Sequence, residues 1–223
     1  MSQPSRREAL KRIGATVAMF GGTSTLAAMS WDQTGVSNRA KAGQRIVRDF
    51  RTPPRSDLPE MAVSKQGDDP AALTLAAIDA LGGMARFVEK GDVVAIKPNI
   101  GWDRAPIHAA NTNPQVVAAV VRAAYDAGAK NVVVTDFSCN EPQRSFQRSG
   151  IWKATYDAGG EIVLPADHQF KMLRIRGKVL DQWPVLRPIL DEDKVINIPI
   201  AKHHSLARFT CSMKNWYGLI GGR

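Results

Sequence analysis

The chain has 223 residues, of which 44% are hydrophobic and 23% charged, and its formal net charge at pH 7 is +9. This composition is ordinary for a globular protein and excludes a chain that is disordered throughout. The basic residues are scattered, with no dense block of Lys and Arg interleaved with aromatic residues, so the charge does not indicate nucleic-acid binding. A moderately basic protein of this kind is better matched to small anionic ligands.

The first thirty residues carry the pattern of an export signal. Two adjacent arginines precede an uncharged, mildly hydrophobic stretch from Ile13 to Ser30. This resembles a twin-arginine translocation (Tat) signal, whose usual motif is matched by Ser5, Arg6, Arg7, Leu10 and Lys11, with Ala9 in place of its phenylalanine. We therefore predict a signal peptide over residues 1–30, passage through the Tat translocase, and a periplasmic or otherwise exported protein. A leader that is not cleaved would serve as a membrane anchor, and an amphipathic amino-terminal helix is the alternative to a signal peptide.

The two cysteines, Cys139 and Cys211, stand alone in the sequence. Neither has a CxxC or CxxH neighbour, so no iron–sulfur cluster or structural zinc site is expected from this chain's own thiolates. A disulfide between them is one alternative outside the cytoplasm. The sequence favours the other alternative, two buried and unreactive thiols.

Residues 31–69 are predicted to be a linker or extended segment, because proline and turn-forming residues recur in RTPPRSDLPE and KQGDDP. One short strand is expected near Gln44 to Asp49. The α/β domain is predicted over residues 70–223. Its first helix begins after Asp69, a helix cap followed by proline, and stops at the glycine pair 82–83.

A strand, a helix and a second strand follow at the spacing of a crossover unit. The apolar run Val93 to Ile96 predicts the first strand, Pro114 to about Ala127 the helix, and Asn131 to Thr135 the second strand. A crossover of this length joins parallel strands, so their carboxyl ends lie at one edge of the sheet. The fold class is therefore α/β, a mostly parallel sheet with flanking helices in a Rossmann-like, three-layer arrangement.

The second half of the domain predicts further elements of the same kind. We expect a helix over 145–157, a short strand within GGEIVLP at 159–165, and a hairpin at the sheet margin in FKMLRIRGKVL at 170–180. A further strand is expected from Lys194 to Ile198.

Polar residues follow each predicted parallel strand. Lys97 and Asn99 follow the first, Asp136 and Ser138 the second, and Lys202 with His203 and His204 the last, while Lys214 and Asn215 lie where a later turn could close over the same edge. Lysines crowded into a concave site repel one another and lose hydration unless an anion is present. We therefore expect an anionic small molecule or cofactor to be bound there by Lys97, Asn99, Lys202, Lys214 and Asn215. The alternative is that the lysines point separately into water.

Histidine and aspartate supply the candidates for proton transfer or metal binding. Because adjacent residues on an extended segment face opposite ways, one metal ion cannot easily use both His203 and His204. Asp136 has three open roles: metal ligand, base, or cap of the helix that follows it. The chain has no GxGxxG and no P-loop, which disfavours a conventional dinucleotide or nucleoside-triphosphate cradle. The metal, if any, is not identified by these residues.

Three stretches resemble the successive motifs of a known family. VVAIKPNIG, TNPQVVAAVVRAAYDAGAKNVVVTDFS and VINIPIAKHHSLARFTCSMKNWYGLIGG are similar to the family of the domain of unknown function 362 over roughly Asp92 to Gly222. Its last motif is matched by Asn197, Pro199, Lys202, His204, Lys214, Asn215 and Gly218, which selects His204 over His203. The resemblance implies the α/β fold and the site positions. Members often carry ferredoxin-like cysteine clusters or a Tat leader, which implies redox chemistry and a redox partner protein.

Family members usually continue well beyond this last motif, so the resemblance also implies a chain truncated at its carboxyl terminus, with an incomplete sheet. We predict an exported α/β protein that binds an anionic ligand or cofactor, with His204 and Asp136 as the catalytic candidates of an oxidoreductase. Whether it is an enzyme is left open. The alternatives are a non-catalytic periplasmic binding or accessory protein and an inactive truncated fragment.

Overall fold

The computed structural model describes residues 11, 14–17, 21 and 49–222. Most of the predicted signal peptide at 1–30, and residues 44–48 of the strand predicted before the domain, lie outside the described residues. Asp49 is described and belongs to no strand.

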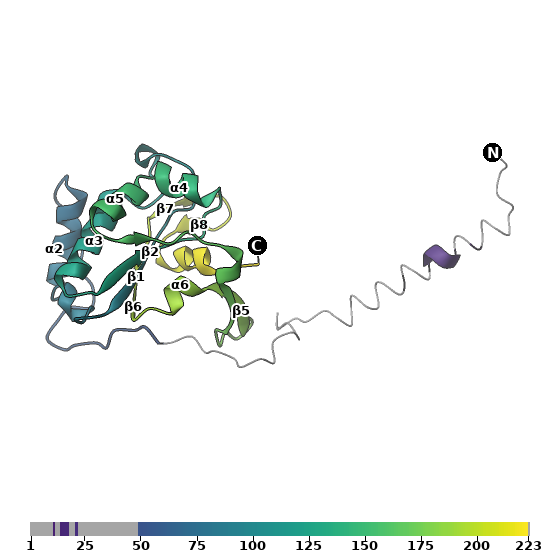
Figure 1. The fold of residues 1–223 in the computed structure, drawn as a ribbon, viewed down its shortest axis with the longest axis horizontal. Helices are drawn as coiled ribbons and strands as arrows, with labels where there is room; N and C mark the ends of the chain where they lie inside the picture. Colours follow the sequence, from purple (N-terminus) through teal and green to yellow (C-terminus); the bar gives the residue numbers. More distant parts are fainter. Residues whose placement is uncertain (1–10, 12–13, 18–20, 22–48, 223) are drawn as a thin grey trace.

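A four-stranded parallel sheet forms the centre of the molecule, with strand order β3-β2-β1-β6 (Figure 1). The strands are β1 (Val93–Pro98), β2 (Asn131–Val134), β3 (Glu161–Ile162) and β6 (Lys194–Ile198). β1 lies between β2 and β6, and Ile96 is in register with Val134 on one side and Ile196 on the other. The parallel α/β fold predicted from the crossover spacing is confirmed. β1 is longer than predicted, because Pro98 still pairs with Ile198 at the end of the strand.

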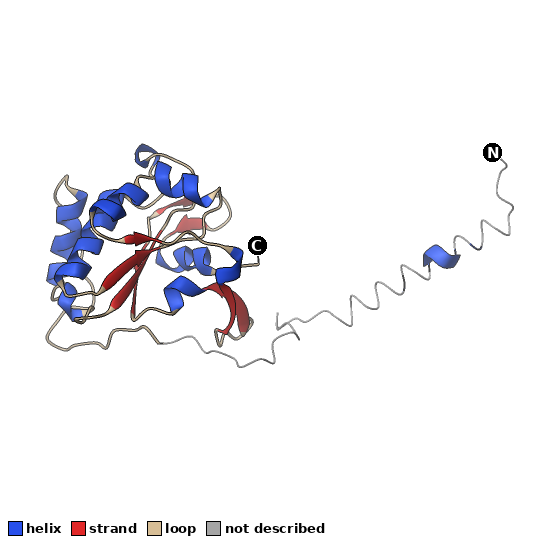
Figure 2. Ribbon diagram, viewed as in Figure 1, coloured by secondary structure: helices blue, strands red, loops and turns tan. Residues whose placement is uncertain are grey.

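Helices cover one face of this sheet (Figure 2). They are α2 (Pro70–Ala80), α3 (Pro114–Asp126), α4 (Pro142–Arg148) and α5 (Ile151–Asp157). Alternate strand residues such as Val94 and Val132 point to this face and pack with Val117 and Val121 of α3 in the larger hydrophobic core. The predicted cap forms, since Asp69 accepts a backbone N–H bond at the start of α2, and Asn113 caps α3 in the same way.

The helix predicted over 145–157 is two short helices. Gly150 separates α4 from α5 with a backbone φ of +75°, a left-handed conformation that glycine adopts without strain and that ends a helix. The sequence pattern alone did not mark this break, because the apolar spacing continues across it.

The opposite face is covered mainly by an antiparallel hairpin of β4 (Phe170–Arg174) and β5 (Gln182–Leu186). The first strand of this hairpin lies in the predicted range 170–180, but the second lies beyond it, and the hairpin is a separate two-stranded sheet that does not extend the margin of the parallel sheet. Leu173 and Val185 pack against Ala95 and Val133 in a second hydrophobic core. The helix α6 (Arg187–Leu190) and the 3-10 helix η4 (Trp216–Leu219) complete this layer.

The chain after β6 turns back over the carboxyl ends of β1 and β6 (Figure 1). It forms a short antiparallel hairpin, β7 (Lys202–His204) and β8 (Arg208–Thr210), followed by α7 (Ser212–Asn215). Three further 3-10 turns lie in the connections: η1 (Met84–Arg86), η2 (Pro106–His108) and η3 (Asp167–Gln169). The β7–β8 hairpin and α7 thus place polar residues beside the strand ends.

Candidate functional site

The centre of the site is a buried ion pair between Lys97 and Asp136. Lys97, next to the last residue of β1, has no exposed surface, and its Nζ lies 2.5 Å from Oδ1 of Asp136, which follows β2. Nζ also donates to the carbonyl oxygen of Pro98 at 2.8 Å. Because β1 and β2 are parallel neighbours, their carboxyl ends bring these two side chains together as the sequence predicted.

The Asp136 carboxylate also organises the loops after both strands. Its Oδ2 accepts the backbone N–H of Ile100 at 2.6 Å, and its Oδ1 accepts that of Phe137 at 2.9 Å. The helix-capping role considered for Asp136 is wrong, because Glu141 caps the next helix, α4. With Lys97 and two backbone amides around it, Asp136 serves as a fixed anionic anchor within the fold.

Asn215 of α7 connects the ion pair to the rest of the site. Its side-chain oxygen accepts from Lys97 Nζ at 3.2 Å and from Asn99 Nδ2 at 3.1 Å. Its amide group donates to the carbonyl oxygen of Lys97 at 3.2 Å and to the side-chain oxygen of Asn197 at 2.7 Å. α7 is therefore fastened to the ends of both β1 and β6.

Lys202 joins the same network from the β7–β8 hairpin. Its Nζ donates to Oδ1 of Asn99 at 2.8 Å and to the carbonyl oxygen of Ala110. Lys97 and Lys202 therefore lie at one edge of the sheet, linked through Asn99 and Asn215. The structure thus brings together residues that are up to 118 positions apart in the chain.

A small cavity of about 60 Å³ opens beside this network. Its polar lining includes Asn99, Asp136, Lys202, His204, Thr210, Lys214 and Asn215, and its rim includes Trp102, Cys139 and Tyr217. Lys97 lies behind the cavity wall and does not line it. Since one water molecule occupies about 30 Å³ in the liquid, the cavity has room for one small anionic group and not for a whole cofactor.

Positive charge is concentrated at this cavity. Burial lowers the pKa of Lys202 below its ordinary value, and repulsion from Lys214 lowers it further, while Cys139 and Asp136 act in the opposite direction. Lys214 lies over the ring of Tyr217, with Nζ 5.0 Å from the ring centre. Within the described part of the chain, neither Lys202 nor Lys214 has a carboxylate within ion-pair distance. The positive charge of these two ammonium groups is therefore not offset by an ion pair within this part of the chain.

His204 lines the cavity, but its ring also supports the hairpin that carries it. Its Nδ1 accepts the backbone N–H groups of Leu206 and Ala207, each at 3.2 Å, across the turn between β7 and β8. His203 is exposed and does not line the cavity. Among the described residues, no group of three or more His, Cys, Asp or Glu side chains is placed to hold a metal ion.

Three residues of the site were given no role from the sequence. Gly218 packs so closely on the ion pair that an added Cβ would lie 2.1 Å from Asp136 Oδ1 and 2.8 Å from Lys97 Nζ. Thr210 is buried at the cavity with no hydrogen-bond partner for its hydroxyl among the described residues. Cys139 and Cys211 are free, and Cys139 is exposed, so the expectation of two buried thiols is wrong. Cys139 comes three residues after Asp136, close to a strand end, and this position in the sequence could have identified it as a residue of the site.

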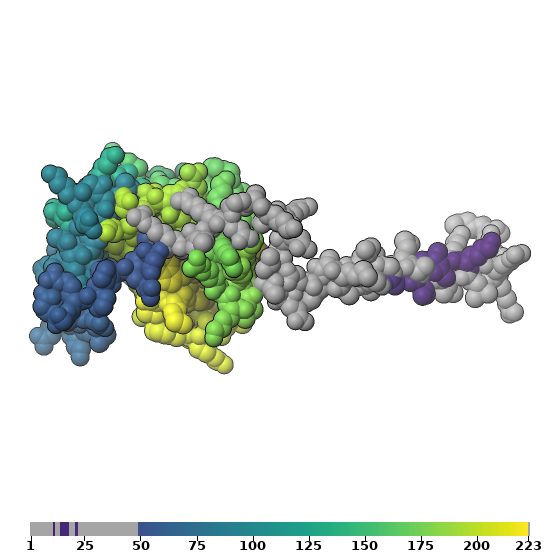
Figure 3. Space-filling model, turned by 90° about the horizontal axis from the view of Figure 1, so that it is seen from below, coloured from purple at the N-terminus to yellow at the C-terminus, as the bar shows by residue number. Residues whose placement is uncertain are grey.

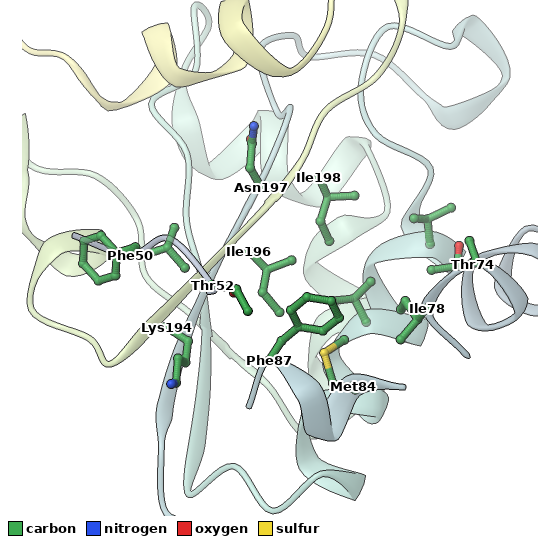
Figure 4. Close-up of a pocket in the computed structure, with 14 residues that line it drawn as sticks. Phe50, Thr52, Thr74, Ile78, Met84, Phe87, Lys194, Ile196, Asn197 and Ile198 are labelled. Atoms are coloured by element: carbon green, nitrogen blue, oxygen red, sulfur yellow. The ribbon is translucent and has the colours of Figure 1, made fainter. Parts of the chain in front are cut away.

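Larger hollows lie beside the edge strand β6, away from this network. One of about 500 Å³ is lined mainly by apolar residues of α2, α3 and β6, including Ile78 and Ile196, and by Phe87 after η1 (Figure 4). A second of about 500 Å³ lies on the other face of β6 and is lined by Phe50 and by residues of the carboxyl-terminal part such as Trp216. In Figure 3 the described chain from residue 49 on, in dark blue, lies beside the carboxyl-terminal part, in yellow.

These hollows lack convergent polar groups. Lys194 is a titratable residue that lines the first hollow. Its Nζ is already paired with Oε1 of Glu89 at 3.1 Å and lies 3.7 Å from Oδ2 of Asp92. We therefore assign the candidate site to the small polar cavity at the strand ends, where the charged groups meet.

Comparison with known proteins agrees with the resemblance seen in the sequence. The chain is 28% identical over 153 residues to thylakoid-associated protein sll1697 of Synechocystis sp., and the match covers 66% of this chain and 44% of that protein. The chain thus spans less than half the length of this relative. No solved structure matches the present chain. Within the described residues no helix is long and apolar enough to cross a membrane. Because the model of the domain of unknown function DUF362 matches residues 94–223, more than half of the sequence, the chain belongs to the DUF362 family.

Proposed function

We propose that this protein binds a small anion, or the carboxylate or phosphate group of a larger ligand or cofactor, in the cavity at the strand ends. The observation that carries the proposal is the pair of ammonium groups, Lys202 and Lys214, that line one small cavity without a carboxylate partner among the described residues. An anion there would offset the repulsion between the two lysines and the loss of hydration of Lys202.

The neighbouring amides support binding rather than mere charge attraction. Asn99 and Asn215 are fixed by their hydrogen bonds to Lys202 and Lys97, so the polar groups of the cavity wall are held in place before a ligand arrives. Trp102 and Tyr217 lie at the cavity and are each partly exposed. The aromatic rings give a flat surface on which the remainder of a larger anionic ligand can rest.

The same contacts favour a binding role over acid–base catalysis. The charge of Asp136 is taken up by Lys97 and by two backbone N–H groups, and Nδ1 of His204 is occupied by the turn. The proposed function is therefore ligand or cofactor binding by an accessory protein. The oxidoreductase with a redox partner is the second candidate, and it is supported by the free, exposed Cys139 at the rim of the cavity.

We also propose export, on the strength of the twin-arginine pattern in residues 1–30. The relative from Synechocystis sp. is named as thylakoid-associated, and a place at or across a membrane for this chain agrees with that name.

The binding proposal is tested by titrating the full chain with sulfate and with inorganic phosphate at low ionic strength in a calorimeter. Lys202→Gln and Lys214→Gln should each weaken binding about tenfold, the effect of losing about 1.4 kcal/mol of charge interaction. Lys90→Gln removes one positive charge from an exposed position far from the cavity and should leave the affinity nearly unchanged. Equal weakening by all three variants would show that only the overall charge matters and would refute the proposed site.

A further inference from the structure

We propose that Cys139 is a reactive thiol that exchanges with the disulfide of a carboxylate-bearing thiol compound, whose negative group is held at Lys202. This inference rests on the proposed anion site and adds to it a covalent partner and a chemical class of ligand. Cys139 is free and exposed, and it lies at the rim of the cavity that Lys202 and Lys214 line.

The backbone around Cys139 is fixed in position. Its N–H donates to the carbonyl oxygen of Gly101 at 2.9 Å, and the hydroxyl of the preceding Ser138 donates to the carbonyl oxygen of Ile100 at 2.5 Å. Both bonds tie the loop after β2 to the loop after β1. The sulfur is therefore presented at a defined place on the cavity rim, next to a site that already attracts anions.

Lys202 is close enough to Cys139 for their charges to interact. Burial lowers the pKa of Lys202, and among the nearby charges Cys139 has the largest opposing effect. Both side chains line the same cavity, so a thiolate formed at Cys139 shares that cavity with the Lys202 ammonium. A thiolate next to a lysine is the reactive form in thiol–disulfide exchange.

Thr210 points independently to a ligand in the same cavity. Its side chain is only 3% exposed, and its hydroxyl has no hydrogen-bond partner within the part of the chain that the structure describes. Burying a hydroxyl without a partner costs about 1–3 kcal/mol. A carboxylate oxygen bound between Lys202 and Thr210 would accept that hydrogen bond. The Thr210 hydroxyl is therefore evidence for a ligand in the cavity that does not depend on Cys139.

The exchange balances without any other reagent. The Cys139 thiolate attacks one sulfur of the ligand disulfide, the sulfur–sulfur bond of the ligand breaks, and a mixed disulfide with Cys139 forms. The released half of the ligand leaves as a thiolate and takes a proton from water. Cys139 is oxidised and the released half is reduced, so the ligand disulfide is itself the oxidant.

The test compares two disulfide probes on the full chain carrying Cys211→Ser, so that Cys139 is the reacting thiol. One probe is 5,5′-dithiobis(2-nitrobenzoate), which carries carboxylates, and the other is the uncharged 4,4′-dithiodipyridine. At low ionic strength we expect the ratio of the two rate constants, anionic to neutral, to fall about tenfold in Lys202→Gln. Thr210→Val should lower the same ratio, whereas Lys90→Gln should not change it. The neutral probe reports accessibility, so a variant that unfolds is recognised by a rise in both rates.

Two outcomes would overturn the inference, and they separate it from the proposed function. If the ratio is unchanged in Lys202→Gln while sulfate still binds the parent protein and not the variant, the anion site stands and the role of Cys139 is refuted. If sulfate does not bind and the ratio is also unchanged, both proposals fail.

Discussion

Lys97 and Asp136 form an ion pair of 2.5 Å in which the lysine side chain is fully buried and the aspartate side chain is 2% exposed. Lys153 and Asp157 form a pair with the same separation on the surface of α5, where the two side chains are 81% and 50% exposed. The two pairs differ in burial and not in distance. Burial decides their effect on stability, because an unpaired charge is tolerated in water and not in a protein interior.

Asp136→Asn should therefore lower the free energy of unfolding by about 3–5 kcal/mol, since it leaves the buried Lys97 ammonium without its counter-charge. Asp157→Asn should change it by no more than about 1 kcal/mol. Urea unfolding of both variants measures the difference. Adding Lys97→Met to Asp136→Asn removes the unpaired charge and should recover part of the loss; no recovery would mean that Asp136 acts mainly through its bonds to the loop amides.

Gly218→Ala should disrupt the site, because its Cβ would lie 2.1 Å from Asp136 Oδ1 and 2.8 Å from Lys97 Nζ. Moving a buried ion pair to make room for a methyl group should cost about 1–3 kcal/mol of stability and weaken sulfate binding. Gly101→Ala is the matched control at the same cavity, since the atom closest to its added Cβ is 4.0 Å away. A Gly218→Ala protein as stable as the parent would contradict the packing described here.

The role of His204 can be decided by comparing His204→Asn with His204→Ala. The ring accepts two backbone N–H groups, and an asparagine oxygen can accept them in its place. We expect His204→Ala to lose about 1 kcal/mol of stability and part of its sulfate affinity, and His204→Asn to recover both. If a catalysed reaction is found and Asn fails to restore it while restoring stability, His204 is catalytic. His203→Ala, at an exposed neighbour, is the control.

Sulfate affinity should fall with rising pH, and it should begin to fall at a lower pH than an ordinary lysine would give. Burial lowers the pKa of Lys202 in the folded protein, and a bound anion favours its charged form. Affinity is thus full below the folded-state pKa and is lost as the pH rises through it. Sulfate keeps a constant charge from pH 6.5 to 10, so the slope belongs to the protein. Calorimetry on Lys202→Gln should show a flatter profile.

The lowered pKa of Lys202 also determines how the stability of the ligand-free protein changes with pH. Between the lowered pKa and the ordinary lysine value near 10.4, the unfolded chain binds more protons than the folded one, so the contribution of Lys202 to stability rises with pH in that window. Thermal unfolding of the parent protein and Lys202→Gln across this range measures it. A stability of the parent relative to Lys202→Gln that falls as the pH rises through this window would contradict the direction of the shift.

Export should depend on the two arginines at positions 6 and 7. Replacing both with lysine keeps the charge and removes the residue pair that a twin-arginine signal requires. Fractionation of expressing cells should find the parent outside the cytoplasm and the double variant inside it. An unchanged distribution would reject a Tat signal and leave the amphipathic helix as the alternative.

The sequence by itself determined the parallel arrangement of the central strands. The run at 93–96, the helix pattern from Pro114 and the run at 131–135 are local patterns, and a crossover of that length leaves few other topologies. From this it followed that Lys97 and Asp136 would meet at one edge. The break at Gly150 and the separate β4–β5 hairpin were not predictable in the same way, because apolar spacing does not reveal where a helix stops or which layer a hairpin joins.

Only the tertiary structure decided the role of each polar side chain at that edge. Lys97, expected to hold a ligand, is occupied internally by Asp136, whereas Lys202 faces the cavity with Lys214. Sequence patterns place a residue at a strand end, but they do not say which carboxylate and amide side chains will surround it. That depends on contacts such as those of Asn215 with Lys97 and Asn99, across more than a hundred residues, and they exist only once α7 packs over the sheet.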